Sequence, residues 1–467
     1  MTSSRTSLPP NWPRHRQWGH TMIDPRVNRA LAFTYQNPVL LLQQLLRFRT
    51  VNPPGNELAC LQFVQDVLAS AGVPSRLLGH HSARPNLIAR LAGAGTAQPL
   101  LLHGHVDVVA AEEPQWQYPP FAGVIENGYV WGRGALDMKG GLAMMLSALL
   151  RARMSGLTLP GDVIVTLVCD EEAGSDLGAK YLVKDWAHLF DGVKYAIGEF
   201  GGFMQTIDGQ PFFPIMVAEK QICWMTATFR GPTGHGSVPK ADMAMTKLGR
   251  MLNMLDRTPL PIHVPPVMQT MLGAIASGVS APVARDLRDL TSADQADAAL
   301  SRLGETGRRL APLLRNTISP TIVQGGEKIN VIPAEVTLQL DGRLLPGQTP
   351  DDLLLGIRAL VGEDVDLVVD RYDWSPAEPD LGWFGTLATI LQEMRPDAIP
   401  LPSVLGGVTD GRFFARLGIQ TYGYLPTPLP NEFDAMSAIH APNERIPVDS
   451  LEFGTQAILT ALQRAPA

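Results

Sequence analysis

The strongest constraint on the fold is the alternation of short, wholly apolar runs with longer amphipathic segments in the first 200 residues. The run VIVTLVC (163–169) and the stretch QPLLLHGHVDVV (98–109) have the length of strands and few polar residues. ELACLQFVQDVLASAG (57–72) and KGGLAMMLSALLRARMSG (139–156) have the length and the apolar spacing of helices. Strands that are apolar on both sides are typical of a mainly parallel sheet covered by helices. The sequence therefore predicts an α/β domain.

The pattern changes near Val217. Alternating polarity predicts half-exposed strands at KQICWMTATFRG, AEVTLQLDGRLLPG and DVDLVVDRYD, separated by the helical segments ADMAMTKLGRMLNMLD and TPDDLLLGIRALVG. This order is typical of a small α+β domain with an antiparallel, ferredoxin-like sheet. The predicted boundaries are an N-terminal arm at 1–25, the α/β domain at 26–217 and 376–467, and an inserted domain at 218–375. Within the insertion, 262–318 is rich in Ala and Arg and is predicted to be helical.

Composition excludes several classes of function. The chain of 467 residues has a net charge of −7 and no block of Lys and Arg, which argues against nucleic acid as a partner. No apolar run is long enough to span a bilayer, and the polar, proline-broken N-terminus lacks the apolar region of a signal peptide. The three cysteines, Cys60, Cys169 and Cys223, are too few and too widely spaced for a disulfide framework. A reducing, cytoplasmic location is the prediction that fits these features.

Three adjacent carboxylates follow the apolar run VIVTLVC, in the motif DEEAGS: Asp170, Glu171 and Glu172. Like charges at the end of a buried strand repel one another, so a positive partner is expected there. Other acids and histidines also stand where strands give way to loops. They are His103, His105 and Asp107 in LLHGHVDVV, Asp137 in GRGALDMKGG, Glu199 in IGEFGG and His440 in AIHAPNE. The ends of parallel strands meet at one edge of the sheet, and imidazole with carboxylate suits zinc and related divalent metals.

Each of these residues also has a purely structural explanation. A helix dipole could stabilise Glu171 and Glu172, Asp137 could form an Asx-turn in its glycine-rich loop, and a histidine beside an aspartate is usually only hydrogen-bonded to it. Each explanation is reasonable alone. Together they require several independent coincidences at strand ends, so we favour the metal site.

The motifs HGHVDVV, GRGALDMKGG, DEEAGS, GEF, GPTGHGSVP, GGVTDGRFF and HAPNE, in this order, resemble the M20 metallopeptidase family over about residues 35–465. The segment 262–318 and the stretches VAEKQ and TDGRFF are most similar to its larger branch, that of vacuolar carboxypeptidases and N-acyl-amino-acid hydrolases. The resemblance implies a two-metal hydrolase domain with an inserted lid or dimerisation domain. It also implies a homodimer formed through that insertion.

The resemblance implies a ligand for each metal-site motif. His105 and Glu199 would bind one ion, Glu172 and His440 the other, and Asp137 would bridge them. The ions would be zinc, with cobalt or manganese as alternatives. The carboxylate of Asp107 would orient the ring of His105.

The remaining acids and histidines near the metals receive different roles. Glu171 matches the general base of the family, which takes a proton from the attacking water. Two cations would offset the repulsion within DEEAGS and make water acidic enough to ionise near neutral pH. Asp170 is interpreted as a hydrogen-bonding group at the strand end. His103 lies outside the implied ligand set and is interpreted as a structural residue or one that lines the rim of the site.

Four further residues are implied to contact the substrate. His235 in GPTGHGSVP would stabilise the oxyanion, reaching the site of the partner subunit, and Asn330 in KINVIPAE would make a polar contact. Arg412 in GGVTDGRFF would hold a substrate carboxylate through its planar fork of donors. The alternatives are an ordinary loop residue for His235 and a surface salt bridge for Arg412. Arg343 in DGRLLPG either contacts the substrate or braces the insertion.

The predicted function is metal-dependent hydrolysis of the amide bond of N-acyl amino acids, or of short peptides with a free carboxylate. A metallocarboxypeptidase or dipeptidase using the same site is the first alternative. A hydrolase of a non-natural amide or carbamate is the second. A non-catalytic binding protein on a decayed hydrolase scaffold is the third, and the presence of the base and all five implied ligands argues against it.

Overall fold

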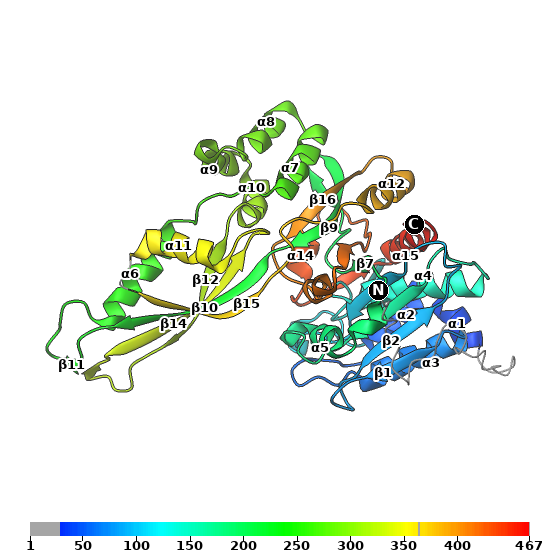
Figure 1. Cartoon of the computed structure of the whole chain (residues 1–467), viewed down its shortest axis with the longest axis horizontal. Helices are drawn as coiled ribbons and strands as arrows, with labels where there is room; N and C mark the ends of the chain where they lie inside the picture. Colours follow the sequence, from blue (N-terminus) through cyan, green and yellow to red (C-terminus); the bar gives the residue numbers. More distant parts are fainter. Residues whose placement is uncertain (1–28, 363–364, 467) are drawn as a thin grey trace, which may run out of the picture.

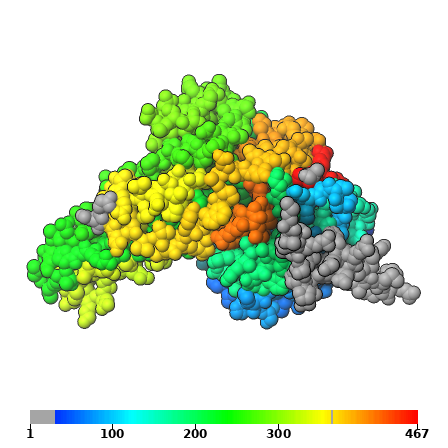
Figure 2. Space-filling model, in the orientation of Figure 1, coloured from blue at the N-terminus to red at the C-terminus, as the bar shows by residue number. Residues whose placement is uncertain are grey.

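The computed structural model describes residues 29–362 and 365–466, and the predicted N-terminal arm at 1–25 lies outside the described residues. The molecule has a large lobe, which contains a nine-stranded sheet, and a small lobe, which contains a four-stranded sheet (Figure 1). Figure 2 shows the small lobe, green to yellow, projecting from the large lobe. The two lobes account for the two kinds of strand pattern in the sequence.

The large sheet is mixed, with parallel strands at its centre. Its strands, in spatial order, are β1 (Ser75–Leu78), β2 (Asn86–Leu91), β6 (Val163–Val168), β3 (Leu100–His105), β7 (Tyr195–Gly198), β17 (Gln420–Gly423), β9 (Gln210–Glu219) and β16 (Ile399–Leu405), with β8 (Gln205–Ile207) paired to β9. β6, β3, β7 and β17 are parallel neighbours, whereas β1, β2 and β6 pair antiparallel. The predicted α/β class with a mainly parallel sheet is confirmed.

Helices cover both faces of this sheet because consecutive strand residues point to opposite sides. Leu100 and Leu102 of β3 belong to the core that includes α4, and Leu101 belongs to the core that includes α5. The first core also contains residues of α1 (Arg29–Tyr35), α2 (Pro38–Leu46), α3 (Leu58–Ser70), α4 (Lys139–Met154), α12 (Phe384–Met394), α14 (Ala435–Ala438) and α15 (Val448–Gln463). The second contains residues of α5 (Ala179–Asp185) and α13 (Gly411–Phe414). Every residue of β3 and β6 is buried, which explains why β6 is apolar apart from Thr166 and why β3 begins with three leucines.

The small lobe has the predicted antiparallel, ferredoxin-like arrangement. Its elements follow in the order β10 (Gln221–Arg230), α6 (Ala244–Arg257), β12 (Thr317–Gln324), β14 (Glu335–Leu344), α11 (Pro350–Val361) and β15 (Asp366–Asp373). The sheet order is β12-β14-β10-β15, and both helices pack on one face of it. The edge strand β12 was missed by the sequence analysis because its segment TISPTIVQ contains a proline and lacks alternating burial.

Short elements complete both lobes. A second sheet of the large lobe consists of β4 (Val124–Glu126), β5 (Tyr129–Trp131) and β18 (Arg445–Pro447). At the tip of the small lobe, β11 (Gly234–His235) pairs with β13 (Val331–Ile332). The 3-10 turns are η1 (Glu113–Gln115), η2 (Glu171–Ala173), η3 (Ala187–Phe190), η4 (Ala311–Leu313) and η5 (Ala415–Leu417).

The segment 262–318 is helical, as predicted, but it packs on the large sheet. Its helices are α7 (Pro266–Gly278), α8 (Ala281–Asp289), α9 (Ala293–Arg302) and α10 (Gly304–Leu310). Val267, Met271 and Ile275 form one apolar stripe of α7, and this helix lies against β16 and β9. These helices therefore share the core of the large lobe, although the predicted boundaries assign them to the insertion. Within the described residues, no helix is long and apolar enough to cross a membrane.

The chain crosses between the lobes after β9, between α6 and α7, before β12 and after β15. Lys220, between β9 and β10, is buried and donates hydrogen bonds to the carbonyls of Pro312 and Arg315 and to the hydroxyl of Thr317. Burial lowers the pKa of Lys220 to about 7. Its three acceptors tie the first crossing to the end of the helical segment, so the base of the small lobe is held by specific contacts.

Candidate active site

Acids and histidines converge at one edge of the large sheet. β3 ends at His105, Glu199 directly follows β7, and η2, which carries Glu171 and Glu172, follows β6. Because these three strands are parallel neighbours, their carboxyl ends meet. Asp137 comes from the glycine-rich turn before α4. The sheet topology thus brings together motifs that are far apart in the sequence.

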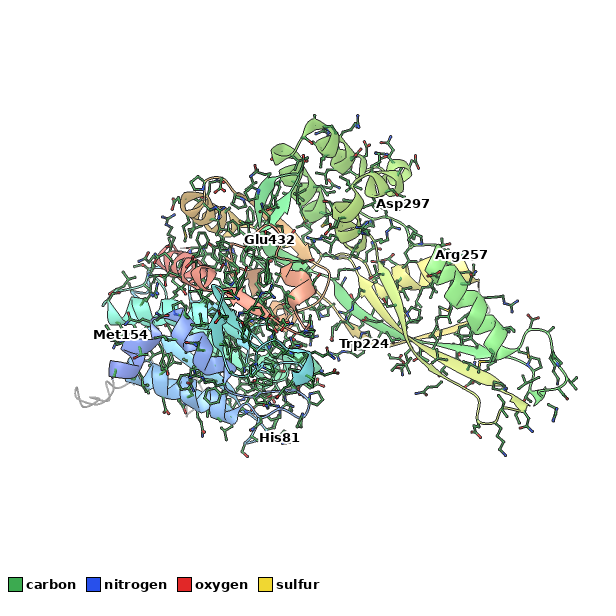
Figure 3. All side chains as sticks on the ribbon, turned by 180° about the vertical axis from the view of Figure 1, so that it is seen from behind. His81, Met154, Trp224, Arg257, Asp297 and Glu432 are labelled. Atoms are coloured by element: carbon green, nitrogen blue, oxygen red, sulfur yellow. The ribbon has the colours of Figure 1, made fainter. Side chains whose placement is uncertain are left out.

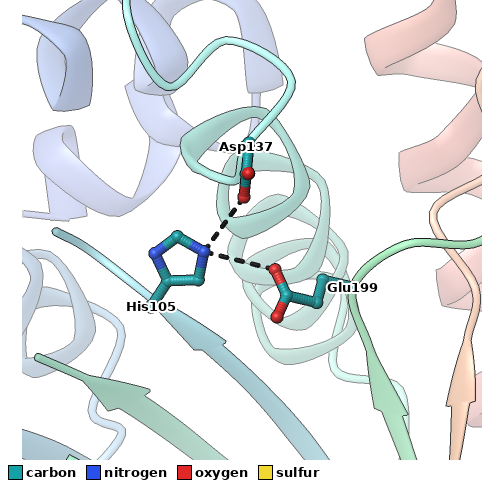
Figure 4. Close-up of side chains that lie close together, drawn as sticks. All are labelled: His105, Asp137 and Glu199. Atoms are coloured by element: carbon teal, nitrogen blue, oxygen red, sulfur yellow. Dashed lines mark hydrogen bonds and ion pairs between the residues drawn. The ribbon is translucent and has the colours of Figure 1, made fainter. Parts of the chain in front are cut away.

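The first cluster consists of His105, Asp137 and Glu199, all buried (Figure 4). His105 Nε2 lies 3.1 Å from Asp137 Oδ1 and 3.2 Å from Glu199 Oε2. The three groups each offer one ligand atom, and these atoms lie within 4.8 Å of one another. This is a set of donors that could hold a metal ion.

The second cluster uses the other oxygen of Asp137. His440 Nε2 lies 3.1 Å from Asp137 Oδ2 and 3.3 Å from Glu172 Oε2. These atoms also lie within 4.8 Å of one another. Asp137 therefore directs one carboxylate oxygen at each cluster, as a bridging ligand would. The five residues implied as ligands are brought together.

The charges in the two clusters fit divalent cations. Burial raises the pKa of Glu199 to about 8, and the hydrogen bonds that the ring of His440 donates to Asp137 and Glu172 raise the pKa of His440 to about 10. Glu172 Oε1 is buried and has no hydrogen-bond partner. Buried carboxylates with an unpartnered oxygen need positive charge nearby. Nitrogen and oxygen donors of this kind suit zinc, cobalt and manganese.

The ring of His105 is oriented by a different atom from the one expected. Its Nδ1 lies 2.9 Å from the backbone carbonyl of Asp107 and 3.6 Å from the carboxylate oxygen Oδ1. The carboxylate instead accepts hydrogen bonds from Asn52 Nδ2 at 2.8 Å and from the backbone N–H groups of Glu171 at 3.3 Å and Glu172 at 3.1 Å. Asp107 therefore connects His105 to the loop that carries Glu171.

Asp170 and His103 have the structural surroundings that the sequence analysis expected. Asp170 lies 3.2 Å from Arg84 Nη2 and accepts a hydrogen bond from the backbone of Leu177. His103 is buried, its Nε2 lies 3.2 Å from the hydroxyl of Thr421, and burial lowers its pKa to about 3. His103 is therefore uncharged and lies outside both clusters.

Glu171 and Arg412 are neighbours beside the two clusters. Burial raises the pKa of Glu171 well above its usual range, with Glu199 adding to the effect and His105 opposing it. Arg412 is 2% exposed, and its Nη1 lies 4.0 Å from Glu171 Oε1. Its Nε lies 3.9 Å from Asp373 Oδ2 and has no hydrogen-bond partner. Because Arg412 is buried, the alternative of a surface salt bridge does not hold.

The other three predicted substrate contacts are not brought to this site within the chain. His235 and Asn330 are exposed neighbours at the tip of the small lobe, where the N–H of Gly236 donates to the carbonyl of Asn330 at 2.8 Å. Figure 1 shows this tip, marked by β11, at the end of the molecule far from the large lobe. Arg343 lies at the base of the small sheet and binds Asp341 through Nε at 2.8 Å.

A sequence model of Peptidase family M20/M25/M40 matches residues 101–464. The chain belongs to this family. The match includes every motif of the two clusters, from the strand that ends in His105 to the loop that carries His440.

Several known proteins are similar to this M20 chain. The mouse N-fatty-acyl-amino acid synthase/hydrolase PM20D1 is 28% identical over 384 residues, which cover 79% of this chain and 74% of that protein. Pig aminoacylase-1 is 24% identical over 397 residues, covering 83% and 86%. Among solved structures, the dipeptidase Dug1p from Saccharomyces cerevisiae has a TM-score of 0.65 at 16% identity, covering 94% of this chain and 99% of that one. This last likeness confirms the fold.

The structure adds a buried ion pair that sequence analysis missed, Arg133 with Glu444. The carboxylate of Glu444 accepts hydrogen bonds from the backbone N–H groups of Leu136 at 2.7 Å and Asp137 at 3.1 Å, and from Arg133 Nη1 at 2.6 Å. Arg133 Nη2 donates to the carbonyl of His440 at 3.0 Å. Arg133 stands in the motif GRGALDMKGG and Glu444 in HAPNE. A charged residue among glycine, alanine and proline was the feature of the sequence that could have pointed to them. The pair connects two ligand-bearing loops.

We predict that Glu444→Gln weakens metal binding roughly 10- to 100-fold, because the turn before Asp137 and the loop of His440 lose their shared anchor. Equilibrium dialysis against graded free zinc, read as bound metal per chain, measures the change. Glu452→Gln is the matched control, since Glu452 is exposed and paired with Arg151 at the surface. Equal metal affinity in the two variants would contradict the prediction.

Proposed function

We propose that this M20 chain hydrolyses the amide bond of N-acyl amino acids with two divalent metal ions. The observation that carries the proposal is the sharing of Asp137 between two clusters, with Glu171 and Arg412 beside them. The relatives PM20D1 and aminoacylase-1 are named for N-acyl amino acids. One side of the site thus offers metal ligands and a base, and the other offers a cation for a carboxylate.

The two ions would be held by His105, Asp137 and Glu199 and by Asp137, Glu172 and His440. We favour zinc, with cobalt or manganese as alternatives, because the donors are imidazole and carboxylate. When bound, such ions polarise a carbonyl and make water acidic enough to ionise near neutral pH.

Glu171 is the general base of the proposed reaction. Its backbone N–H is fixed by the carboxylate of Asp107, and its own carboxylate is partly enclosed next to the ligands. It would take the proton of the attacking water and deliver it to the nitrogen that leaves as an amine.

Arg412 would bind the carboxylate of the substrate. Its guanidinium is buried, and its Nε has no hydrogen-bond partner. The nearest carboxylate oxygens, those of Glu171 and Asp373, lie 4.0 and 3.9 Å from the guanidinium. A planar fork with free donors matches a carboxylate. The amide next to that carboxylate would then lie beside Glu171.

A peptidase is the second candidate. A metallo-carboxypeptidase, Sso-CP2 from Sulfolobus solfataricus, shares the fold with a TM-score of 0.63 at 18% identity. A C-terminal carboxylate would use Arg412 in the same way.

An amide or carbamate without a carboxylate fits less well because it leaves Arg412 without a partner. A decayed scaffold is disfavoured by the intact clusters.

His235 and Asn330 would act in a homodimer formed through the small lobe. The tip that carries them lies far from the large lobe of its own chain. His235 would then stabilise the oxyanion in the site of the partner subunit, with Asn330 beside it. A cytoplasmic location stays a prediction.

We predict that Glu171→Gln lowers kcat on N-acyl amino acids roughly 100- to 10,000-fold while bound metal is unchanged, because only proton transfer is lost. Steady-state hydrolysis and metal content of the same samples test this, and a chelator should abolish the wild-type activity. Glu126→Gln, on an exposed strand, is the control. Wild-type enzyme that is fully loaded with metal and hydrolyses N-acyl amino acids no faster than Glu171→Gln would refute the proposal.

We predict that Arg412→Lys raises KM for N-acyl amino acids roughly 10-fold or more, about 1.4 kcal/mol, because Lys keeps the charge but loses the fork. The same variant should leave the hydrolysis of the matching N-acyl amino acid amides, which lack the carboxylate, nearly unchanged. Kinetics on the two substrate series measure the difference. A parallel loss on both series would show that Arg412 does not bind the carboxylate.

We predict that His235→Ala and Glu171→Gln, each nearly inactive alone, regain activity when mixed. A mixed dimer combines the intact Glu171 of one chain with the intact His235 of the other. Activity is measured after subunit exchange, with the two variants kept apart as control. No recovery, despite exchange detected by mass, would place His235 outside the site of the partner.

A further inference from the structure

Trp224 is an exposed aromatic residue on a central strand of the small sheet. Its neighbours Cys223 and Met225 are buried in the core beneath α6 and α11, so alternation turns Trp224 to the face that carries no helix. It is 40% exposed. Figure 3 shows Trp224 where the small lobe meets the large lobe. A large apolar side chain is thus open to solvent at the junction of the lobes.

A row of three residues across adjacent strands fixes this indole. Asp341 of β14 and Arg371 of β15 stand directly opposite Trp224. The indole Nε1–H donates to Asp341 Oδ1 at 3.1 Å, and the guanidinium of Arg371 lies 5.0 Å from the ring centroid. The ring therefore has a defined orientation before any ligand arrives, which lowers the entropic cost of binding.

The row is connected to the proposed catalytic residues. A Cβ on Gly174, the residue after η2, would lie 3.3 Å from Arg371 Nη1, so this arginine packs on the loop that carries Glu171. Arg371 also binds Asp373 at 2.7 Å. Asp373 lies 3.9 Å from Arg412 Nε. Trp224 is thus linked through one arginine to the loop of the base, and through that arginine and Asp373 to the proposed carboxylate-binding residue.

We propose that Trp224 binds the side chain of the amino acid that carries the substrate carboxylate, and that it favours large apolar and aromatic side chains. The inference rests on the proposed function, because Arg412 sets where the carboxylate lies. The side chain of an amino acid branches from the carbon that bears this carboxylate. It would therefore lie near Arg412, which the row of Trp224 reaches through Arg371 and Asp373.

The chemistry of the row selects an uncharged side chain. Asp341 is paired with Arg343, and Arg371 is paired with Asp373, so each charge beside the indole already has a partner. What remains for a ligand is the apolar ring, which gains most from burial against another large apolar or aromatic group. N-acyl derivatives of phenylalanine and leucine are accordingly the expected substrates, ahead of those of alanine and glycine.

The test compares two substrate series with metal-loaded enzyme. One series keeps the acyl group and varies the amino acid from glycine through alanine and leucine to phenylalanine. The other keeps phenylalanine and varies the length of the acyl chain. Trp224→Ala should lower kcat/KM for the phenylalanine substrate roughly 10- to 100-fold and leave the glycine substrate little changed. Trp224→Phe should retain most of the preference.

Controls separate this role from others. Phe33→Ala removes another exposed aromatic residue, on α1 of the large lobe, and should change neither series. Equal losses on glycine and phenylalanine substrates, or losses that follow acyl length instead, would overturn the proposal. A change of oligomeric state on Trp224→Ala, measured as the mass of the assembly in solution, would also overturn it. Such a change would show that another copy of the chain covers the indole.

A binding measurement keeps the proposal independent of turnover. Calorimetry of free phenylalanine and free glycine, titrated into metal-loaded Glu171→Gln with and without Trp224→Ala, should show that phenylalanine binding alone depends on Trp224. If the wild type hydrolyses no substrate of the two series but phenylalanine binding depends on Trp224, the proposed function fails and the assignment of Trp224 stands. If phenylalanine binds equally well without the indole, the assignment fails, whatever the hydrolysis.

Discussion

The site depends on the repulsion among carboxylates that the large sheet forces together. Parallel strands bring Glu172 and Glu199 to one edge of the sheet, and the turn before α4 adds Asp137 there. Their burial leaves little water to solvate the charges. The nearest positive partners within the chain are the imidazoles of His105 and His440. Metal ions of charge two would satisfy the same carboxylates more completely, and both oxygens of Asp137 are already turned toward the two places where such ions fit.

The geometry is held by hydrogen bonds from the main chain. Glu444 accepts three backbone N–H groups of the turn that ends in Asp137, and Asp107 accepts those of Glu171 and Glu172. Backbone donors have fixed directions, so each accepting carboxylate locks a loop without a second mobile side chain. The residues of the two clusters and Glu171 are therefore held in place by acids that do not themselves belong to the clusters.

Part of the proposed ligand set could be predicted from the residues themselves, because these ligands stand at the end of an apolar strand or in a glycine-rich turn. His105, Asp137 and Glu199 are recognisable in this way, and the order of the motifs added their partners. The connection through the carbonyl of Asp107 could not be predicted, since it depends on how the chain turns after β3. The role of Glu444 could not be predicted for a related reason. Its partners are backbone N–H groups of a distant loop, and the sequence alone does not show which backbone groups lie near a side chain.

The limits on the fold prediction have the same origin. The apolar stripe of α7 shows that this helix must be covered, but it does not show by which sheet, and the structure covers it with β9 and β16. Alternation identified β10, β14 and β15, whose one face is buried. It missed β12, which lies at the edge with most of its residues exposed. Pattern thus reveals which surface a segment buries, and only packing reveals the partner.

Arg412 lies between carboxylates of the two lobes. It stands on α13 of the large lobe, yet one of its two nearest carboxylates, Asp373, ends the last strand of the small lobe, and the other is Glu171. A carboxylate entering between them would complete the donors that the guanidinium leaves free, and it would do so at the crossing between the lobes. The orientation of the small lobe then matters to the base as well as to Trp224, because Arg371 packs against the loop of Glu171. In the proposed mechanism, Arg412 at the junction would therefore couple recognition of the substrate carboxylate to the position of Glu171.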